Sequence, residues 1–154
     1  MDMEPPYQGA VLPDSWFVVF HPKSAMGRWI RFFTPGKYKH VSAFAYVPGC
    51  NVWVFYDAQW DGLRLVHMSQ TKAEQTFVEL CDKDCAVIKI KAKDGPISVW
   101  DRAGFSCVSA TKHLLGLSCV SITPTGLYHG LIRNGGVLVS GPQPQAADRS
   151  VPPS

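Results

Sequence analysis

Two strand-like segments joined by a short turn place the tightest limit on how this chain can fold. Residues 40–47 (HVSAFAYV) and 52–60 (VWVFYDAQW) are rich in β-branched and aromatic residues, and PGCN lies between them. Proline and glycine in so short a connection are typical of a turn, so the two segments predict an antiparallel β-hairpin. Side chains alternate between the two faces of a hairpin, and this limits which residues can meet across it.

The open end of this hairpin carries polar side chains. His40 begins the first strand. If the turn is centred near Gly49 and Cys50, the residue that faces His40 lies near position 58 or 59. Asp57 and Gln59 can therefore both approach the face that carries His40, and the sequence leaves open which of them does so.

The remaining periodic segments predict an α+β domain. Three more segments have the composition or the alternation of strands, at residues 15–21, 61–68 and 85–93. Helices are expected at residues 25–33 after Ser24, after a capping box formed by Thr71 and Glu74, from Cys107 onward, and after Thr123 and Pro124, where Gly135 and Gly136 close the last one. We expect an antiparallel sheet of about five strands packed against the helix that carries Cys107.

Cys107 lies where a helix is predicted to begin. In the segment FSCVSATKHLLGL, residues 105–117, it follows Ser106, a residue that commonly caps helix N-termini. The positive end of the helix dipole and the unpaired amides of the first turn favour a thiolate at this position. The same amides could stabilise negative charge on a carbonyl oxygen that the sulfur attacks. Read alone, the segment favours Cys107 as a small buried apolar side chain, as most free cysteines are.

Cys107, His40 and the polar residues opposite His40 together predict a catalytic site. A nucleophilic cysteine needs an imidazole to take its proton, and that imidazole needs a polar partner that fixes its tautomer. Asp57 or Gln59 would be that partner. His21, which precedes a proline, could also reach this end of the sheet, and its expected role is structural.

The length and composition of the chain limit the number of domains and the kinds of partner that we expect. The chain has 154 residues, a net charge of +3 and scattered Lys and Arg, so we expect one domain and no nucleic-acid partner. We assign residues 14–140 to this domain, and residues 1–13 and 141–154 to disordered terminal segments.

The sequence also bears on compartment and metal binding. No apolar segment has the length of a membrane span, and the acidic, proline-bearing N-terminus lacks a signal-peptide pattern, so we expect synthesis in the cytoplasm. Five cysteines, an odd number, favour reduced thiols. Cys81 and Cys85, with His67, are a weak indication of zinc, and we expect no metal and no cofactor.

The order of these segments resembles a known family. KYKHVSAFAYV, then WVFYDAQW, then FSCVSATKHLLGL is similar to the circularly permuted branch of the NlpC-type papain-like superfamily, in which the histidine and polar strands precede the cysteine helix. This branch includes lecithin:retinol acyltransferase-like proteins, YiiX-like hydrolases and small proteins of tailed bacteriophages. YDAQW resembles a pattern of the phage members, and ITPTGLYHGLIRNGG resembles their closing Thr-Pro helix and glycine pair. The resemblance covers about residues 15–138.

By motif, the resemblance implies a permuted papain-like fold with Cys107 as nucleophile, His40 as base and Asp57 as the orienting residue. Gln59 remains an alternative, because the separation of His40 from Asp57 is longer than in the non-permuted enzymes. The resemblance implies a cysteine-dependent hydrolase or acyltransferase of amides or esters, with peptidoglycan peptides or acyl groups as substrates. In a phage setting it implies a role in the virion or the host cell, with phage structural proteins as partners. The alternative is a non-catalytic structural or interaction protein on the same fold, such as a virion component.

Overall fold

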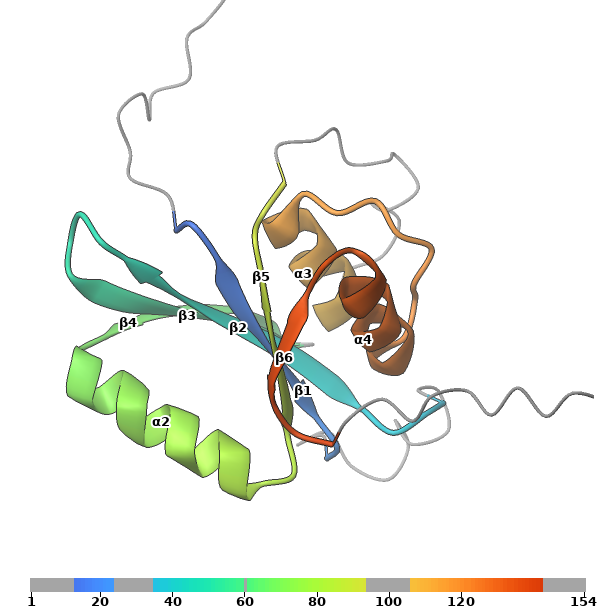
Figure 1. Ribbon diagram of the computed structural model, residues 1–154, viewed down its shortest axis with the longest axis horizontal. Helices are drawn as coiled ribbons and strands as arrows, with labels where there is room; N and C mark the ends of the chain where they lie inside the picture. The colour runs from blue at the N-terminus through green and yellow to red at the C-terminus, as the bar shows by residue number, and fades with distance from the viewer. Residues whose placement is uncertain (1–12, 24–34, 60, 94–105, 143–154) are drawn as a thin grey trace, which may run out of the picture.

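The protein is an α+β structure built on one open antiparallel sheet (Figure 1). The computed structural model describes residues 13–23, 35–59, 61–93 and 106–142. Within these residues the six strands are β1 (Trp16–His21), β2 (His40–Val47), β3 (Val52–Gln59), β4 (Gly62–Met68), β5 (Ala86–Ile90) and β6 (Val137–Ser140), in the spatial order β4-β3-β2-β1-β5-β6. The three helices are α2 (Gln70–Asp82), α3 (Cys107–Leu115) and α4 (Pro124–Arg133).

The predicted hairpin is present as β2 and β3. The turn is closed by a hydrogen bond from the Cys50 amide to the Val47 carbonyl (3.2 Å), and Asn51 adopts a left-handed backbone conformation (φ 53°) that asparagine tolerates well. In the resulting register Ser42 faces Asp57. Continuing this register by two residues brings His40 level with Gln59 and diagonal to Asp57.

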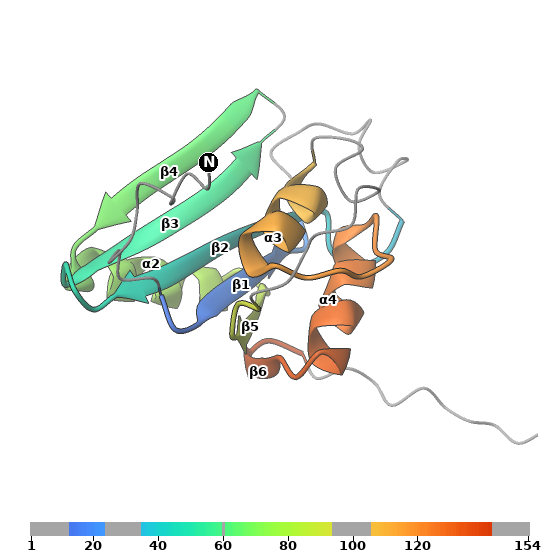
Figure 2. The ribbon, with the colours of Figure 1, turned by 90° about the horizontal axis from the view of Figure 1, so that it is seen from above.

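Successive side chains of the strands point to opposite faces of the sheet, and apolar side chains form a core on each face. On one face Val18, Phe20, Val41 and Ala43 pack with residues of α3 and α4. On the other face Val19, Phe44 and Val87 pack with Leu80 of α2, in a smaller cluster. Figure 2 shows α3 and α4 on one side of the sheet and α2 on the other.

The sheet has one strand more than the sequence predicted. β6 follows α4 directly and pairs with β5 at the sheet edge, with a register irregularity between Val87 and Ile88. The connection depends on Gly136, because a Cβ there would lie 2.6 Å from the Ile88 side chain and 2.9 Å from the Leu131 carbonyl oxygen. Four residues with alternating exposure carry too weak a pattern to be recognised beside a Pro- and Gln-rich tail.

The N-terminus of α2 also differs from the prediction. Its N-cap is Ser69, whose hydroxyl accepts a hydrogen bond from the Lys72 amide (3.4 Å), so the predicted capping box at Thr71 and Glu74 was wrong. Ser69 has the extended backbone that an N-cap requires (φ −67°, ψ 164°), while Thr71 already lies inside the first turn. The cap at Thr123 and Pro124 is confirmed, with the Gly126 amide donating to the Thr123 hydroxyl (3.1 Å).

Several predictions concern residues outside the described ranges. These are the helix at residues 25–33 and most of the two terminal segments, 1–12 and 143–154. Among the helices of the described ranges, none combines the length and the apolar character that crossing a membrane requires.

Candidate functional site

The start of α3 is held by a reciprocal capping box. The Ser109 amide donates to the Ser106 hydroxyl (3.1 Å), and the Ser106 amide donates to the Ser109 hydroxyl (2.9 Å). Two amides of the first turn are thereby satisfied, and the capping box does not use those of Cys107 and Val108. Cys107 is thus the first residue of a helix that ends at Leu115 and is capped by Gly116 in the left-handed conformation (φ 60°).

The start of β2 is held from two sides. The Lys39 amide donates to the His21 carbonyl of β1 (2.8 Å), and the Tyr38 amide donates to the Thr125 hydroxyl of α4 (3.0 Å). Gly36 packs so closely on Thr125 that an added Cβ would lie 2.4 Å from its Oγ1 atom. The segment that leads into His40 is therefore fixed by both the sheet and α4.

His40 forms a short charged hydrogen bond with Asp57. Its Nε2 atom lies 2.6 Å from Oδ1 of Asp57, and the two side chains are 21% and 11% exposed. The second carboxylate oxygen of Asp57 accepts a hydrogen bond from Nε2 of Gln59 (2.7 Å). Asp57 is thus the hydrogen-bond partner of the imidazole, and Gln59 donates to the other oxygen of Asp57.

This arrangement shifts the pKa values of both His40 and Asp57. Burial alone would lower the pKa of His40, but the hydrogen bonds with Asp57 and with the Cys107 side chain outweigh it and raise that pKa from 6.5 to about 9. Burial would raise the pKa of Asp57, but its hydrogen bonds with His40 and Gln59 lower it. His40 therefore carries a proton near neutral pH, beside an ionised carboxylate.

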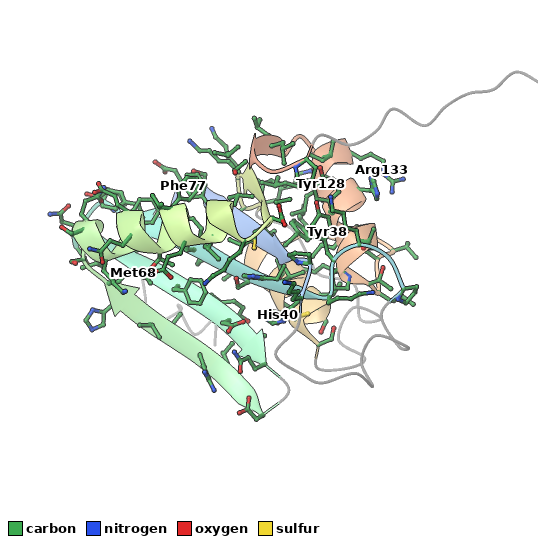
Figure 3. All side chains as sticks on the ribbon, turned by 90° about the horizontal axis from the view of Figure 1, so that it is seen from below. Tyr38, His40, Met68, Phe77, Tyr128 and Arg133 are labelled. Carbon is green, nitrogen blue, oxygen red and sulfur yellow. The ribbon has the colours of Figure 1, made fainter. Side chains whose placement is uncertain are left out.

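Cys107 approaches His40 from the opposite layer of the molecule. Its side chain is half-buried against the core under α3, whereas the register places His40 and Asp57 on the α2 side of the sheet. His40 is the first residue of β2, so its ring lies at the end of the sheet, where it can meet the start of α3. Figure 3 shows His40 at this end and Met68 at the other. The structure thus brings together Cys107, His40, Asp57 and Gln59.

A second cysteine–histidine pair, which the sequence did not reveal, lies beside the first. His21 pairs with His40 across β1 and β2, and the two rings lie 5.5 Å apart at an interplanar angle of 33°. Nε2 of His21 lies 2.8 Å from the Ser42 hydroxyl, and its Nδ1 lies 3.5 Å from the Cys85 sulfur. The signal that could have found this pair is the register of β1, β2 and β5, which places the three residues together.

His21 titrates in the opposite direction to His40. Burial, then the charge of His40, and also that of Lys83 together lower the pKa of His21 to about 4, against the opposing charge of Asp57. Cys85 is only 2% exposed. The two adjacent imidazoles therefore have different charge states near neutral pH.

The sequence-based indication of zinc includes Cys81, whose side chain lies outside the described part of the structure. Cys85 meets His21, while His67 lies on the edge strand β4. In the described parts of the chain, no three His, Cys, Asp or Glu side chains are grouped so that they could hold a metal ion.

Comparison with known proteins finds no family model, no curated protein and no solved structure that matches this chain. The interpretation of the site therefore depends on its geometry and chemistry.

Proposed function

We propose that this protein is a cysteine-dependent hydrolase or acyltransferase that acts on an amide or ester, with a permuted papain-like arrangement of its site. The observation that carries the proposal is the connected set Cys107–His40–Asp57, with a 2.6 Å hydrogen bond from the imidazole to the carboxylate. Nucleophile, proton carrier and orienting carboxylate are the three groups that thiol acyl transfer requires.

The first half-reaction forms a thioester. Nε2 of His40 is bonded to Asp57, so Nδ1 is the ring nitrogen that holds the proton given up by Cys107. The sulfur then attacks the carbonyl carbon, and the C=O π electrons move onto the oxygen. The amide of Cys107 is the proposed donor to that oxyanion. When the C=O bond re-forms, the bond to the leaving nitrogen or oxygen breaks, and the leaving group takes the proton from His40.

The second half-reaction regenerates the thiol. His40 takes a proton from a water molecule, whose oxygen attacks the thioester carbon, and the sulfur leaves and recovers the proton. An alcohol or amine in place of the water would give acyl transfer. Asp57 stays ionised throughout and stabilises the imidazolium that forms in each half.

The proposal is tested by trapping the acyl-enzyme. The folded protein is incubated with a p-nitrophenyl ester and, separately, with a peptide p-nitroanilide, and the modified residue is located by mass spectrometry of its peptides. We expect one acyl group on Cys107 and release of nitrophenol or nitroaniline. The Cys107→Ser variant should release both products more slowly than the parent does.

Cys119→Ser is the matched control, because Cys119 is also half-buried against the same core, beside Gly130 of α4. It should acylate as the parent does. If neither reagent acylates Cys107, or if acylation is confined to exposed Cys50, the proposed function is wrong and the alternative of a non-catalytic structural protein takes its place.

A further inference from the structure

We propose that His21 is a positioning residue for His40. The His21 ring lies against the His40 imidazole and limits its rotation, so that one nitrogen of His40 stays on Asp57 and the other stays toward Cys107. The inference rests on the proposed function, because it assigns His21 a part in the reactivity of that cysteine.

The contact between the two rings has the geometry of an aromatic pair. Their centroids are 5.5 Å apart, within the roughly 4.5 to 7 Å range in which aromatic pairs attract each other. The pair is fixed by register, because His21 and His40 are direct cross-strand partners. His40 is the first residue of its strand, so strand pairing alone restrains its side chain only weakly.

The His21 ring is itself held at both nitrogens. The Cys85 thiol is placed to donate to the Lys83 carbonyl (3.8 Å), which leaves the sulfur to accept from Nδ1–H of His21 (3.5 Å). Nε2 of His21 is then the acceptor for the Ser42 hydroxyl (2.8 Å). A neutral imidazole satisfies this set, since it has one donor nitrogen and one acceptor nitrogen.

The charged and titratable groups around His21 favour that neutral form. They come from every neighbouring element: His40 on β2, Asp57 on β3, Lys83 after α2, and Cys85 before β5. Two positive charges near His21 oppose one negative charge, and burial disfavours any charge on the ring. A neutral ring can lie against the protonated His40 without repelling it.

The test compares two substitutions of His21 for their effect on Cys107. Phe keeps a flat ring that can lie against His40, and Ala removes it. The rate of alkylation of Cys107 by iodoacetamide is divided by the rate for exposed Cys50 in the same molecule. This ratio does not depend on the concentration of the reagent. We expect this ratio to fall by about tenfold in His21→Ala, because small losses of orientation are costly, and to stay within about threefold of the parent in His21→Phe.

A second measurement follows His40 without using the nucleophile. In a Cys107→Ser background, the proton shared by His40 and Asp57 should give a downfield NMR signal that exchanges slowly with water. His21→Ala should broaden or remove this signal, and His21→Phe should keep it. Thermal unfolding of each variant separates these effects from loss of the fold.

The outcomes distinguish the two proposals. If the parent Cys107 is no more reactive than Cys50, the proposed function fails. If the parent Cys107 is reactive and His21→Ala leaves both the ratio and the NMR signal unchanged, the positioning role alone is overturned. The same holds if His21→Phe loses as much as His21→Ala while both remain folded.

Discussion

The two cysteine–histidine pairs differ in two respects. One is the residue that is hydrogen-bonded to the ring nitrogen facing away from the cysteine, and the other is the exposure of the sulfur. In one pair His40 is bonded to the carboxylate of Asp57, and the sulfur of Cys107 is half-buried. In the other, His21 is bonded to the hydroxyl of Ser42, and Cys85 is buried. The rings belong to neighbouring strands and lie 5.5 Å apart.

This difference accounts for their opposite titration. Near Asp57 the protonated form of the imidazole gains a charge-assisted hydrogen bond, and the pKa of His40 rises to about 9. A hydroxyl cannot compensate for burial in this way, and the pKa of His21 falls to about 4. The residue bonded to the second ring nitrogen therefore helps to decide which of the two imidazoles holds a proton near neutral pH.

The largest expected effect comes from removing the carboxylate. Asp57→Ala should slow alkylation of Cys107 near neutral pH by on the order of a hundredfold, because His40 loses the charge that stabilises its protonated form. Ser42→Ala, the equivalent change in the second pair, should slow it by less than about threefold. Equal effects of the two substitutions, measured by stopped alkylation and peptide mapping, would remove the distinction between the pairs.

The same distinction predicts how stability depends on pH. The folded-state pKa of His40 lies above its ordinary value, so its stabilising effect is complete below about pH 6.5 and is lost as the pH rises toward about 9. The folded-state pKa of His21 lies below its ordinary value, so its effect is complete above about pH 6.5 and is lost as the pH falls toward about 4.

Urea unfolding across this pH range measures both effects. The contribution of either histidine to the free energy of unfolding should change by up to about 3 kcal/mol across its range. His40→Phe should flatten the alkaline side of the parent's stability profile, and His21→Phe should flatten the acid side. If each substitution altered the other side instead, the charge states inferred for the two rings would be reversed.

A smaller effect is expected at Gln59, which donates a hydrogen bond to Asp57. Gln59→Ala should slow alkylation of Cys107 by about tenfold or less, through the loss of one hydrogen bond to Oδ2 of Asp57. Asp57→Ala, assayed in parallel, should be the slower of the two variants. A Gln59→Ala variant slower than Asp57→Ala would make the amide the third member of the site.

The smallest effect is expected at Lys83, an exposed residue whose charge lowers the pKa of His21. Lys83→Met should raise the pKa of His21 slightly, because it removes a nearby positive charge. The NMR titration of His40 should stay as in the parent. A comparable change in the pKa of both histidines would mean that the two pairs titrate as one unit.

The sequence predicted the first pair because its determinants are local. The PGCN turn sets the register of β2 and β3, and Ser106 sets the start of the Cys107 helix, so both can be read from short segments. The choice of Asp57 over Gln59 as the direct partner of His40 depended on turn geometry, which the sequence left open. The structure resolves it by placing Asp57 on the imidazole and Gln59 on Asp57.

The second pair could not be predicted in this way. It depends on the pairing of β1 with both β2 and β5, which joins His21, Ser42 and Cys85 over more than sixty residues of sequence. No local pattern at Cys85 indicates its partner. β6 was missed for a related reason, since its place depends on pairing with β5 and on the close approach of Gly136 to Ile88, which its four residues do not indicate.

The most direct test of the proposed catalytic site is the order in which the thiols of the folded protein react. The protein is treated with limiting iodoacetamide at about pH 7, and each cysteine-containing peptide is quantified over time. We predict that Cys107 is alkylated first, ahead of exposed Cys50, and that buried Cys85 reacts last despite its contact with His21. If Cys50 or Cys119 is alkylated first while Cys107 stays unmodified, Cys107 is not the nucleophile.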